Sequence, residues 1–365
     1  MFSYWEKKEF SNYDTVIIGA GLAGLFTSLF LKKKYPSRRI LVLDKNMFPM
    51  ASTKNAGFAC MGSITELEDD LKTSTLSEVI SLVEERYKGL AILRQELGDQ
   101  SISYQSNGSF ELIEKENTQV VSKISEWNKE LYFIANQEAF SVASLSDRSF
   151  RGFSAMVKNE WEGEIDTGKM YQRLLSKNRE QQVEIRMNTA VVDFEKKSDS
   201  YEIRLENDFI LKSPQLILCT NAFTEKLLPK VKIQPARGIV LITKPIEQLT
   251  FSGIYHFDTG YYYFREIHGR VLFGGGRHKD VETETTGKLG INDSILSDLN
   301  KKLDEKILPE IPYEIDCAWS GIMGKSKTKK PICEQLDEGL ILLAGFGGMG
   351  VALAPYKAKA LVNLL

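Results

Sequence analysis

Four short runs of mainly apolar residues stand at widely separated positions in the chain. They lie at residues 15–18, 40–43, 215–219 and 340–344. Such continuous runs are typical of strands that are buried on both faces of a parallel sheet. The segment between the first two runs has the length and apolar content of a helix, so residues 14–44 predict a strand–helix–strand unit. Parallel strands are therefore expected at the start, middle and end of the chain.

The segments between these runs carry alternating or aromatic patterns and helical periodicities. Strands of an antiparallel sheet are predicted at residues 239–243, 254–257, 260–265 and 270–274, and further strands at 109–113, 183–186, 190–195 and 201–205. Helices are predicted at residues 77–97, 119–134, 294–303 and 354–365, and a polar loop at 45–63. The predicted fold class is α/β with α+β insertions: a Rossmann-like domain interleaved with a domain built on an antiparallel sheet.

The first apolar run leads into a glycine-rich turn with dinucleotide-binding spacing. The turn reads Gly19-Ala20-Gly21-Leu22-Ala23-Gly24, and Asp44 follows the second strand. In this pattern the glycines permit a tight turn, a close approach of backbone to pyrophosphate and close helix–strand packing, while the acid accepts a hydrogen bond from a ribose hydroxyl. A short membrane helix over residues 16–31 is excluded by its length and glycines. The motif does not separate NAD from FAD.

A second glycine-rich turn follows the last apolar run. Residues 345–350 read Gly-Phe-Gly-Gly-Met-Gly and lead into the last predicted helix. One such turn is a weak signal, but two at opposite ends of the chain indicate a cofactor bound by both terminal segments. The alternative is that the second turn has a purely structural role, as a glycine hinge between strand and helix.

Composition narrows the class of protein further. The 365 residues, 42% hydrophobic and 26% charged, fit one large or two interleaved globular domains. The net charge of −2 implies no nucleic-acid or acidic-lipid partner. The four cysteines are scattered and there are only three histidines, which argues against a metal site. The unpaired cysteine spacing and an N-terminus without an apolar signal core favour a reducing, cytoplasmic location. The lysines of residues 325–330 form a solvated loop or edge a substrate entrance.

Several further motifs occur in a specific order. They lie at residues 52–58, 164–170, 219–224, 235–238, 273–277, 319–323 and 345–355. Together with the first glycine turn, they make nearly the whole chain resemble the D-amino-acid oxidase-like family of FAD-dependent oxidoreductases, which includes glycine, sarcosine and γ-glutamylputrescine oxidases. The resemblance implies an FAD-binding domain of residues 10–75, 145–230 and 330–365 and a substrate domain of residues 76–144 and 231–329.

The resemblance also implies which residues contact FAD. Residues 52–58 would line the pyrophosphate and the isoalloxazine edge, Val191 would meet adenine, and residues 347–351 would place backbone N–H groups at the flavin pyrimidine, where they stabilise negative charge. The cofactor-binding candidates are Gly19, Ala20, Gly21, Leu22, Ala23, Gly24, Asp44, Lys45, Ser52, Thr53, Asn55, Ala56, Gly57, Phe58, Val191, Thr220, Asn221, Gly345, Gly347, Gly348, Met349, Gly350 and Val351.

The sequence departs from the family pattern at three positions. Amino-acid-oxidising relatives commonly carry a carboxylate-binding arginine shortly after the tryptophan–x–glycine motif, but here Gly321 is followed by Ile-Met-Gly. Arg237, Arg277 and Lys325 are alternative candidates for that role. Met323 stands where sarcosine oxidases attach the flavin to a cysteine, so non-covalent FAD is expected. Leu272 stands where they carry the lysine that promotes reaction with O2, so the acceptor is O2 or another oxidant.

The predicted reaction is hydride transfer from a carbon next to nitrogen to flavin N5, and the resulting imine hydrolyses. The substrate is a small amine or an N-substituted amino acid rather than a simple α-amino acid. Pocket candidates are Tyr262 or its neighbour Tyr263, Arg277, Trp319 and Met323. One rival is an FAD-dependent dehydrogenase of a 2-hydroxy acid or polyol, for which His256 and His268 lie near the pocket strands. The other is a non-catalytic flavin-binding protein.

Overall fold

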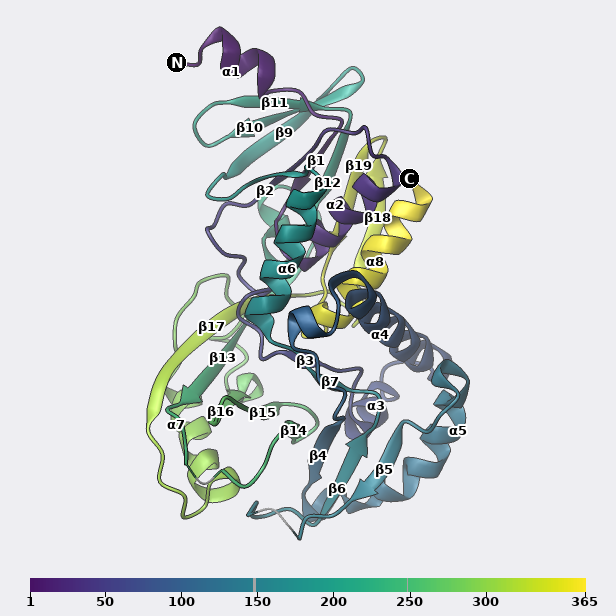
Figure 1. Cartoon of the computed structure of the whole chain (residues 1–365), viewed down its shortest axis with the longest axis vertical. Coiled ribbons are helices and arrows are strands. Elements are labelled where there is room, and N and C mark those ends of the chain that lie inside the picture. Colours follow the sequence, from purple (N-terminus) through teal and green to yellow (C-terminus); the bar gives the residue numbers. More distant parts are fainter. Residues whose placement is uncertain (147–148, 248) are drawn as a thin grey trace.

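A mainly parallel sheet forms one half of the molecule in a computed structural model that describes residues 1–146, 149–247 and 249–365 (Figure 1). Within these residues its strand order is β18-β19-β12-β1-β2-β8. The four apolar runs form its centre as β1 (Thr15–Ile18), β2 (Ile40–Leu43), β12 (Gln215–Leu218) and β19 (Leu340–Ala344), all parallel. β8 (Glu184–Arg186) continues the sheet in parallel, and β18 (Ile332–Asp337) closes the other edge in antiparallel. The prediction of buried parallel strands is confirmed.

Helices from distant parts of the chain cover this sheet. They are α2 (Leu22–Lys34), α6 (Thr167–Glu180) and α8 (Gly350–Leu364), and α4 (Leu76–Leu97) packs across α8. Gly89 makes the α4–α8 crossing possible, because a Cβ there would lie 1.8 Å from the carbonyl oxygen of Ala352. The last helix begins at residue 350, earlier than the predicted 354.

A second, larger sheet forms the other half of the molecule. Its order in the described chain is β17-β13-β16-β15-β14-β4-β6-β5. The bounds are β17 Ile315–Lys325, β13 Gln234–Thr243, β16 Arg270–Gly275, β15 Tyr262–Ile267, β14 Ile254–Phe257, β4 Ser109–Ile113, β6 Ala155–Asn159 and β5 Phe140–Ala143. All neighbours are antiparallel except β14 and β4, which run parallel.

One face of the larger sheet packs on an aromatic core beneath α7 (Asp293–Lys302). The other face looks toward the first sheet. β6 belongs to this sheet although it lies in the segment 145–230, expected in the FAD-binding domain; residues 147–148 of that segment lie outside the described chain. The expected boundary near residue 145 therefore does not separate the two sheets.

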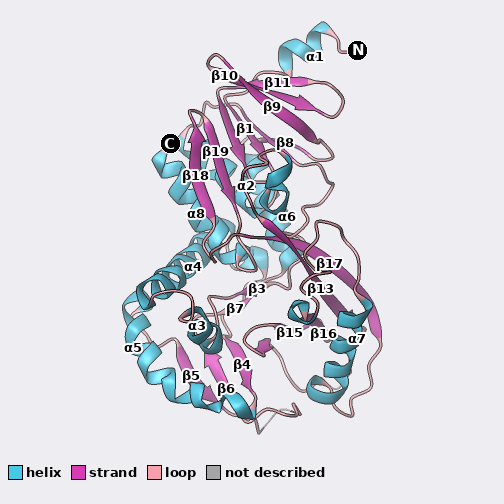
Figure 2. Ribbon diagram, turned by 180° about the vertical axis from the view of Figure 1, so that it is seen from behind, coloured by secondary structure: helices cyan, strands magenta, loops and turns pink. Residues whose placement is uncertain are grey.

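Smaller elements complete the fold. A meander of β9 (Val191–Lys197), β10 (Ser200–Leu205) and β11 (Ile210–Ser213) extends beyond the first sheet, next to α1 (Tyr4–Glu9) (Figure 2). Near the junction of the two halves lie β3 (Phe58–Ala59), β7 (Gly163–Glu164) and α3 (Ile64–Asp70). The helix predicted at 119–134 is a 3-10 segment, Lys115–Lys123, followed by α5 (Ile124–Ala135). The predicted loop 45–63 contains β3, which pairs with β7.

Candidate functional site

A long groove runs between the two sheets at the carboxyl ends of β1, β12 and β19. It consists of two adjoining cavities with a common wall at Gly21, Ala51, Ser52, Cys219 and Asn221. The first cavity reaches the larger sheet, and the second extends along β2 toward the meander. Ligands of open α/β sheets bind at this edge, so the groove is the natural place for a dinucleotide.

The first glycine turn shapes the middle of the groove. Gly19 has a φ of 112°, and a Cβ there would lie 2.4 Å from the carbonyl oxygen of Cys219. A Cβ on Gly24 would lie 1.9 Å from the carbonyl oxygen of Gly19, so only glycine permits this helix–turn contact. Gly21 caps α2 without a side-chain hydrogen bond and lines both cavities. The positive end of the α2 dipole therefore faces the groove, which favours an anion.

Asp44 lies at the end of β2 and lines the second cavity. Its carboxylate accepts hydrogen bonds from the backbone N–H of Ala20 at 3.0 Å and of Asn46 at 2.9 Å, which fix its orientation. Lys45, Val191 and Thr220 line the same cavity. The ammonium of Lys45 lies 3.6 Å from the Phe223 ring centroid, and desolvation lowers the Lys45 pKa.

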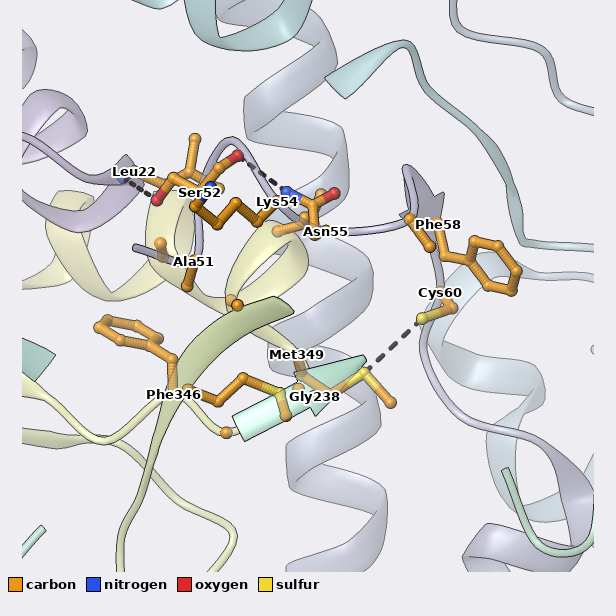
Figure 3. Close-up of a pocket in the computed structure, with 18 of the residues that line it drawn as sticks. Leu22, Ala51, Ser52, Lys54, Asn55, Phe58, Cys60, Gly238, Phe346 and Met349 are labelled. Carbon is orange, nitrogen blue, oxygen red and sulfur yellow. Dashed lines mark hydrogen bonds between the residues drawn. The ribbon is translucent and has the colours of Figure 1, made fainter. Parts of the chain in front are cut away.

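The loop at residues 52–58 is held by its own polar side chains. Ser52 Oγ accepts a hydrogen bond from Leu22 N at 3.0 Å, and Asn55 Nδ2 donates to the Ser52 carbonyl at 2.8 Å (Figure 3). Ser52, Asn55, Ala56 and Phe58 line the first cavity. Thr53 instead bonds to the Pro49 carbonyl.

Gly57 supports the same loop without lining either cavity. It adopts a φ of 77°, and its carbonyl accepts a hydrogen bond from the guanidinium of Arg265 at 3.0 Å. That guanidinium also pairs with Glu164 at 2.9 Å, and both side chains are buried. Thr53 and Gly57 therefore help to shape the loop.

The second glycine turn forms the opposite wall. Residues 347–351 line the first cavity, and apart from the adjoining residues of the chain no described atom lies within 4 Å of a Cβ added to Gly347 or Gly348. The side chain of Asn221 ties this turn to β12 by accepting a hydrogen bond from Gly345 N at 3.0 Å. Gly345 itself does not line the cavity. The turn thus presents backbone, with open space before it, to whatever the cavity holds.

Some of the predicted pocket residues line the first cavity, and others lie outside it. Met323 and Tyr263 line the first cavity. Tyr262 is 1% exposed in the aromatic core, where its hydroxyl donates to Asp298 at 2.5 Å. The expectation that Tyr262 faces the pocket is corrected, because neighbours in a strand point to opposite faces and β15 turns Tyr263 toward the cavity. The predicted alternative of Tyr263 fits the structure.

Trp319 and the cationic candidates lie outside the cavity wall. Trp319 donates its indole N–H to the Lys54 carbonyl at 3.1 Å and so supports the cavity loop from behind. Arg277 begins a 3-10 turn after β16 and does not line the cavity. Arg237 forms a buried two-bonded pair with Glu284, at 2.9 and 2.7 Å. Lys325 is exposed at the end of β17, and partial desolvation lowers its pKa.

Several lining residues were not predicted as site residues. Besides Lys54, Cys60 and Phe346, they include Glu66, Glu162 and His256. His256 pairs across the sheet with Tyr263 on one side and Glu111 on the other, so one row of the larger sheet places these three side chains on the cavity face. The register of β14 with β15 and β4 places His256 and Glu111 on the face of Tyr263, and the local sequence pattern does not report this register. Among the described residues no acidic, cysteine and histidine group is arranged to hold a metal ion.

These observations meet the requirements of a dinucleotide with a large planar ring. The groove contains Asp44 at the end of β2 and the N-terminus of α2 in its middle. Toward the larger sheet, the glycine turn at residues 347–350 exposes backbone without bulky side chains at Gly347 and Gly348. A model of the FAD dependent oxidoreductase family matches residues 14–364. The chain therefore belongs to this family of FAD-dependent enzymes, as the sequence motifs predicted.

Known proteins resemble the chain in sequence over part of its length and in fold over nearly all of it. The chain is 25% identical over 185 residues to the probable oxidoreductase OrdL of Rhizobium meliloti (strain 1021), a match that covers 48% of this chain and only 41% of that protein. Its fold resembles glycine oxidase from Geobacillus kaustophilus (TM-score 0.79, 17% identity, 97% and 95% of the two chains covered). It also resembles L-proline dehydrogenase from P. horikoshii (TM-score 0.77, 16% identity, 97% and 93% covered).

Proposed function

We propose that this enzyme oxidises a C–N bond of an amine or an N-substituted amino acid to an imine, which then hydrolyses. The observation that carries the proposal is the wall of the first cavity. Apolar Phe58 and Met323 and the neutral phenol of Tyr263 line it, and no arginine among the described residues does. Burial raises the Tyr263 pKa to about 12, so the phenol stays protonated at neutral pH.

The missing guanidinium argues against a simple α-amino acid as substrate. Arg237 and Arg265 are engaged with Glu284 and Glu164. Releasing either arginine for a substrate carboxylate would leave a buried carboxylate unpaired, at a cost of about 3–5 kcal/mol. A substrate without an α-carboxylate avoids that cost, as does an N-substituted amino acid whose acid group lies far from the oxidised C–N bond.

FAD fits the groove through residues already placed there. Asp44 would accept a hydrogen bond from the ribose, the α2 N-terminus at Gly21 would face the pyrophosphate, and residues 347–351 would offer backbone N–H groups to the flavin. Bound FAD supplies the hydride acceptor of the reaction. The apolar wall orients the substrate carbon and excludes water, and this desolvation favours the neutral amine that can be oxidised.

We propose that FAD is held without a covalent bond. Met323, whose thioether cannot form a thiolate, lines the cavity at the position considered for attachment. Cys60 also lines the cavity, but burial raises the pKa of its thiol well above the usual value, so little reactive thiolate forms. Denaturing the purified protein and filtering it tests this point: the yellow colour should pass the filter, and colour retained with the polypeptide would contradict it.

A second candidate function has one observation in its favour. His256 lines the cavity and is a suitable proton acceptor for oxidation of a 2-hydroxy acid or polyol. Anaerobic mixing of the holoenzyme with amines and with 2-hydroxy acids separates the two functions. Loss of the visible flavin band with amines alone supports the proposal, loss with hydroxy acids alone supports the rival, and loss with neither points to a non-catalytic flavin protein.

We also propose which electron acceptor the enzyme uses and where in the cell it acts. We propose O2 or another small oxidant as acceptor. All four cysteines are free thiols, which fits the reducing cytoplasm. No helix in the described part of the chain is long and apolar enough to span a membrane.

A further inference from the structure

The inner end of the first cavity is acidic. Glu66 and Glu162 line it, and Glu111 lies beside Glu66, because Ser63 donates its hydroxyl to Glu111 and its N–H to Glu66. Two of these carboxyls are almost fully buried: Glu162 is 1% exposed and Glu111 is 3% exposed. Carboxyl groups are rarely buried together without a partner, so this cluster calls for an explanation.

Hydrogen bonds orient the buried carboxyls but bring no charge. Glu162 accepts from the backbone N–H of Gly62 at 2.9 Å and from Ser109 Oγ at 2.5 Å. Glu111 accepts from Ser63 Oγ at 2.8 Å and from Thr65. These neutral donors satisfy the oxygens, yet desolvation still raises the pKa of both carboxyls. Burial therefore disfavours the charged carboxylates unless a cation lies beside them.

Glu66 completes the cluster from α3. Its Oε2 accepts from Ser63 N at 2.9 Å as part of the capping box of that helix. The rest of the carboxyl packs on Gly260, where an added Cβ would lie only 2.7 Å from Oε1. Both residues line the cavity, so the glycine gives the carboxyl access to that space.

Two basic groups, Arg86 and His256, lie near the three carboxyls. Arg86 is buried and donates to the Met61 carbonyl at 2.5 Å, behind the cavity wall. His256 is only 7% exposed and lines the cavity, and its Nδ1 has no hydrogen-bond partner among the described residues. An unpartnered buried nitrogen beside a carboxylate cluster is costly unless a ligand completes the network.

We propose that this acidic end binds a cationic group of the substrate that is not itself oxidised. The substrate class is then an amine with a second ammonium or similar cation, such as a diamine, and the inference rests on the proposed C–N oxidation. Glu66 and Glu162 supply the negative charge, and the rings of Phe58 and Tyr263, which meet edge to face at 5.7 Å, flank the apolar stem between the two nitrogens. His256 completes the polar network around the bound cation.

The test compares matched compounds on the FAD-loaded enzyme under anaerobic conditions. α,ω-Diaminoalkanes are compared with n-alkylamines and ω-aminocarboxylates of the same chain length, and flavin reduction is followed by visible absorbance. We expect half-maximal reduction at a concentration at least about tenfold lower for the diamines, since a desolvated charge pair readily supplies this factor. Alkylamines or aminocarboxylates that act as well as diamines would overturn the proposal and leave C–N oxidation standing.

Variants assign the effect to the cluster. Glu66→Gln keeps the capping box, which glutamine also forms, and should remove most of the diamine preference. Glu162→Gln is a second variant that keeps an acceptor for Gly62 N. The matched control is Asp69→Asn on the same helix, a solvent-facing partner of Lys72 that does not line the cavity. A diamine preference that survives in both glutamine variants would contradict the assignment.

A binding measurement tests the cation site even if the enzyme oxidises none of the amines. A bis(trimethylammonium)alkane and the alkyltrimethylammonium of equal length are titrated into the holoenzyme by calorimetry. The dication should bind at least about tenfold more tightly to the wild type, and the Glu66→Gln enzyme should lose this difference. If no amine reduces the flavin, the proposed function fails, and this titration alone then decides whether the cation site exists. Equal binding of the two ions would show that it does not.

Discussion

His256 on β14 and Tyr263 on β15 lie directly opposite each other across an antiparallel pair, and both side chains line the first cavity. The side chain of Tyr263 also lies across Gly274 on β16, where a Cβ would come within 2.7 Å of its ring. The pair thus forms the floor of the cavity at the larger sheet. The absence of a side chain at Gly274 is what lets the phenol lie in that orientation.

The two neighbouring tyrosines should respond differently to loss of their hydroxyls. Tyr263→Phe should alter the rate of anaerobic flavin reduction and leave thermal stability close to that of the wild type, because the phenol faces the cavity. Tyr262→Phe should lower the free energy of unfolding by about 1.5–3 kcal/mol, because it removes a hydrogen bond to the carboxylate of Asp298. Stopped-flow absorbance and denaturant titration check the two effects, and the reverse pattern would contradict the placement.

A methyl group added to the second glycine turn should interfere with FAD alone. Gly348 has no described atom within 4 Å of an added Cβ and needs no positive φ, so Gly348→Ala should fold with an unchanged melting temperature in the apoprotein. FAD affinity should fall by about tenfold or more, since the methyl group occupies the space expected for the flavin. Fluorescence titration of the apoprotein with FAD measures this. The control is Gly24→Ala, whose Cβ would lie 1.9 Å from a carbonyl oxygen and which should fail to fold stably.

The carboxylate of Asp44 should matter more for the cofactor than for the fold. Asp44→Asn keeps one oxygen for Ala20 N, loses the acceptor for Asn46 N, and removes the charge-assisted hydrogen bond to a ribose hydroxyl. A loss of about 1.5–3 kcal/mol corresponds to a roughly tenfold to hundredfold rise in the FAD dissociation constant. Asp193→Asn, at an exposed ion pair on β9, is the matched control and should bind FAD normally. Unchanged FAD affinity in Asp44→Asn would argue against the assigned orientation of the cofactor.

The buried carboxyl of Glu162 should give stability a distinctive pH dependence. Desolvation raises its pKa above the usual 4.5, so the folded state binds more protons than the unfolded state above that pH. The free energy of unfolding therefore loses this contribution as pH rises from 4.5 through the raised pKa. Glu162→Gln removes the titration, so its melting temperature relative to the wild type should increase over the same range. The charged and titratable groups around it are Cys60, Glu66, Arg86, Glu111 and His256.

Thermal melts of both proteins across this pH range test the expectation. A constant difference between the two melting temperatures would mean that Glu162 does not titrate with a raised pKa. Glu111→Gln serves as a parallel variant, because the same burial raises its pKa.

Local pattern in the sequence was enough to predict the central part of the fold. Continuous apolar runs mark strands buried on both faces, and the glycine spacing marks the turn after β1, so both follow from local chemistry. The division of the chain between the two sheets could not be predicted from local sequence patterns. β6 pairs with β4 and β5 through contacts distant in sequence, which no local pattern reports.

Contacts between distant segments also determine which residues form the substrate end of the site. Tyr262 and Tyr263 are chemically identical neighbours, and the face toward the cavity depends on the register of β15 with β14 and β16. The arginines were recognised as candidates, but their buried partners Glu284 and Glu164 come from distant segments. The acidic end is assembled from α3, β4, β14 and the segment before β7, so no single stretch of sequence displays it.

The central claim is that this FAD-dependent enzyme oxidises amines. Its most direct test is anaerobic addition of an amine panel to the FAD-loaded protein while the visible flavin band is recorded, with 2-hydroxy acids as the comparison. We expect the band to disappear with at least one amine and the product solution to contain the corresponding carbonyl compound. Hydroxy acids should leave the band unchanged. A flavin band that persists with every amine but disappears with a hydroxy acid would contradict the claim.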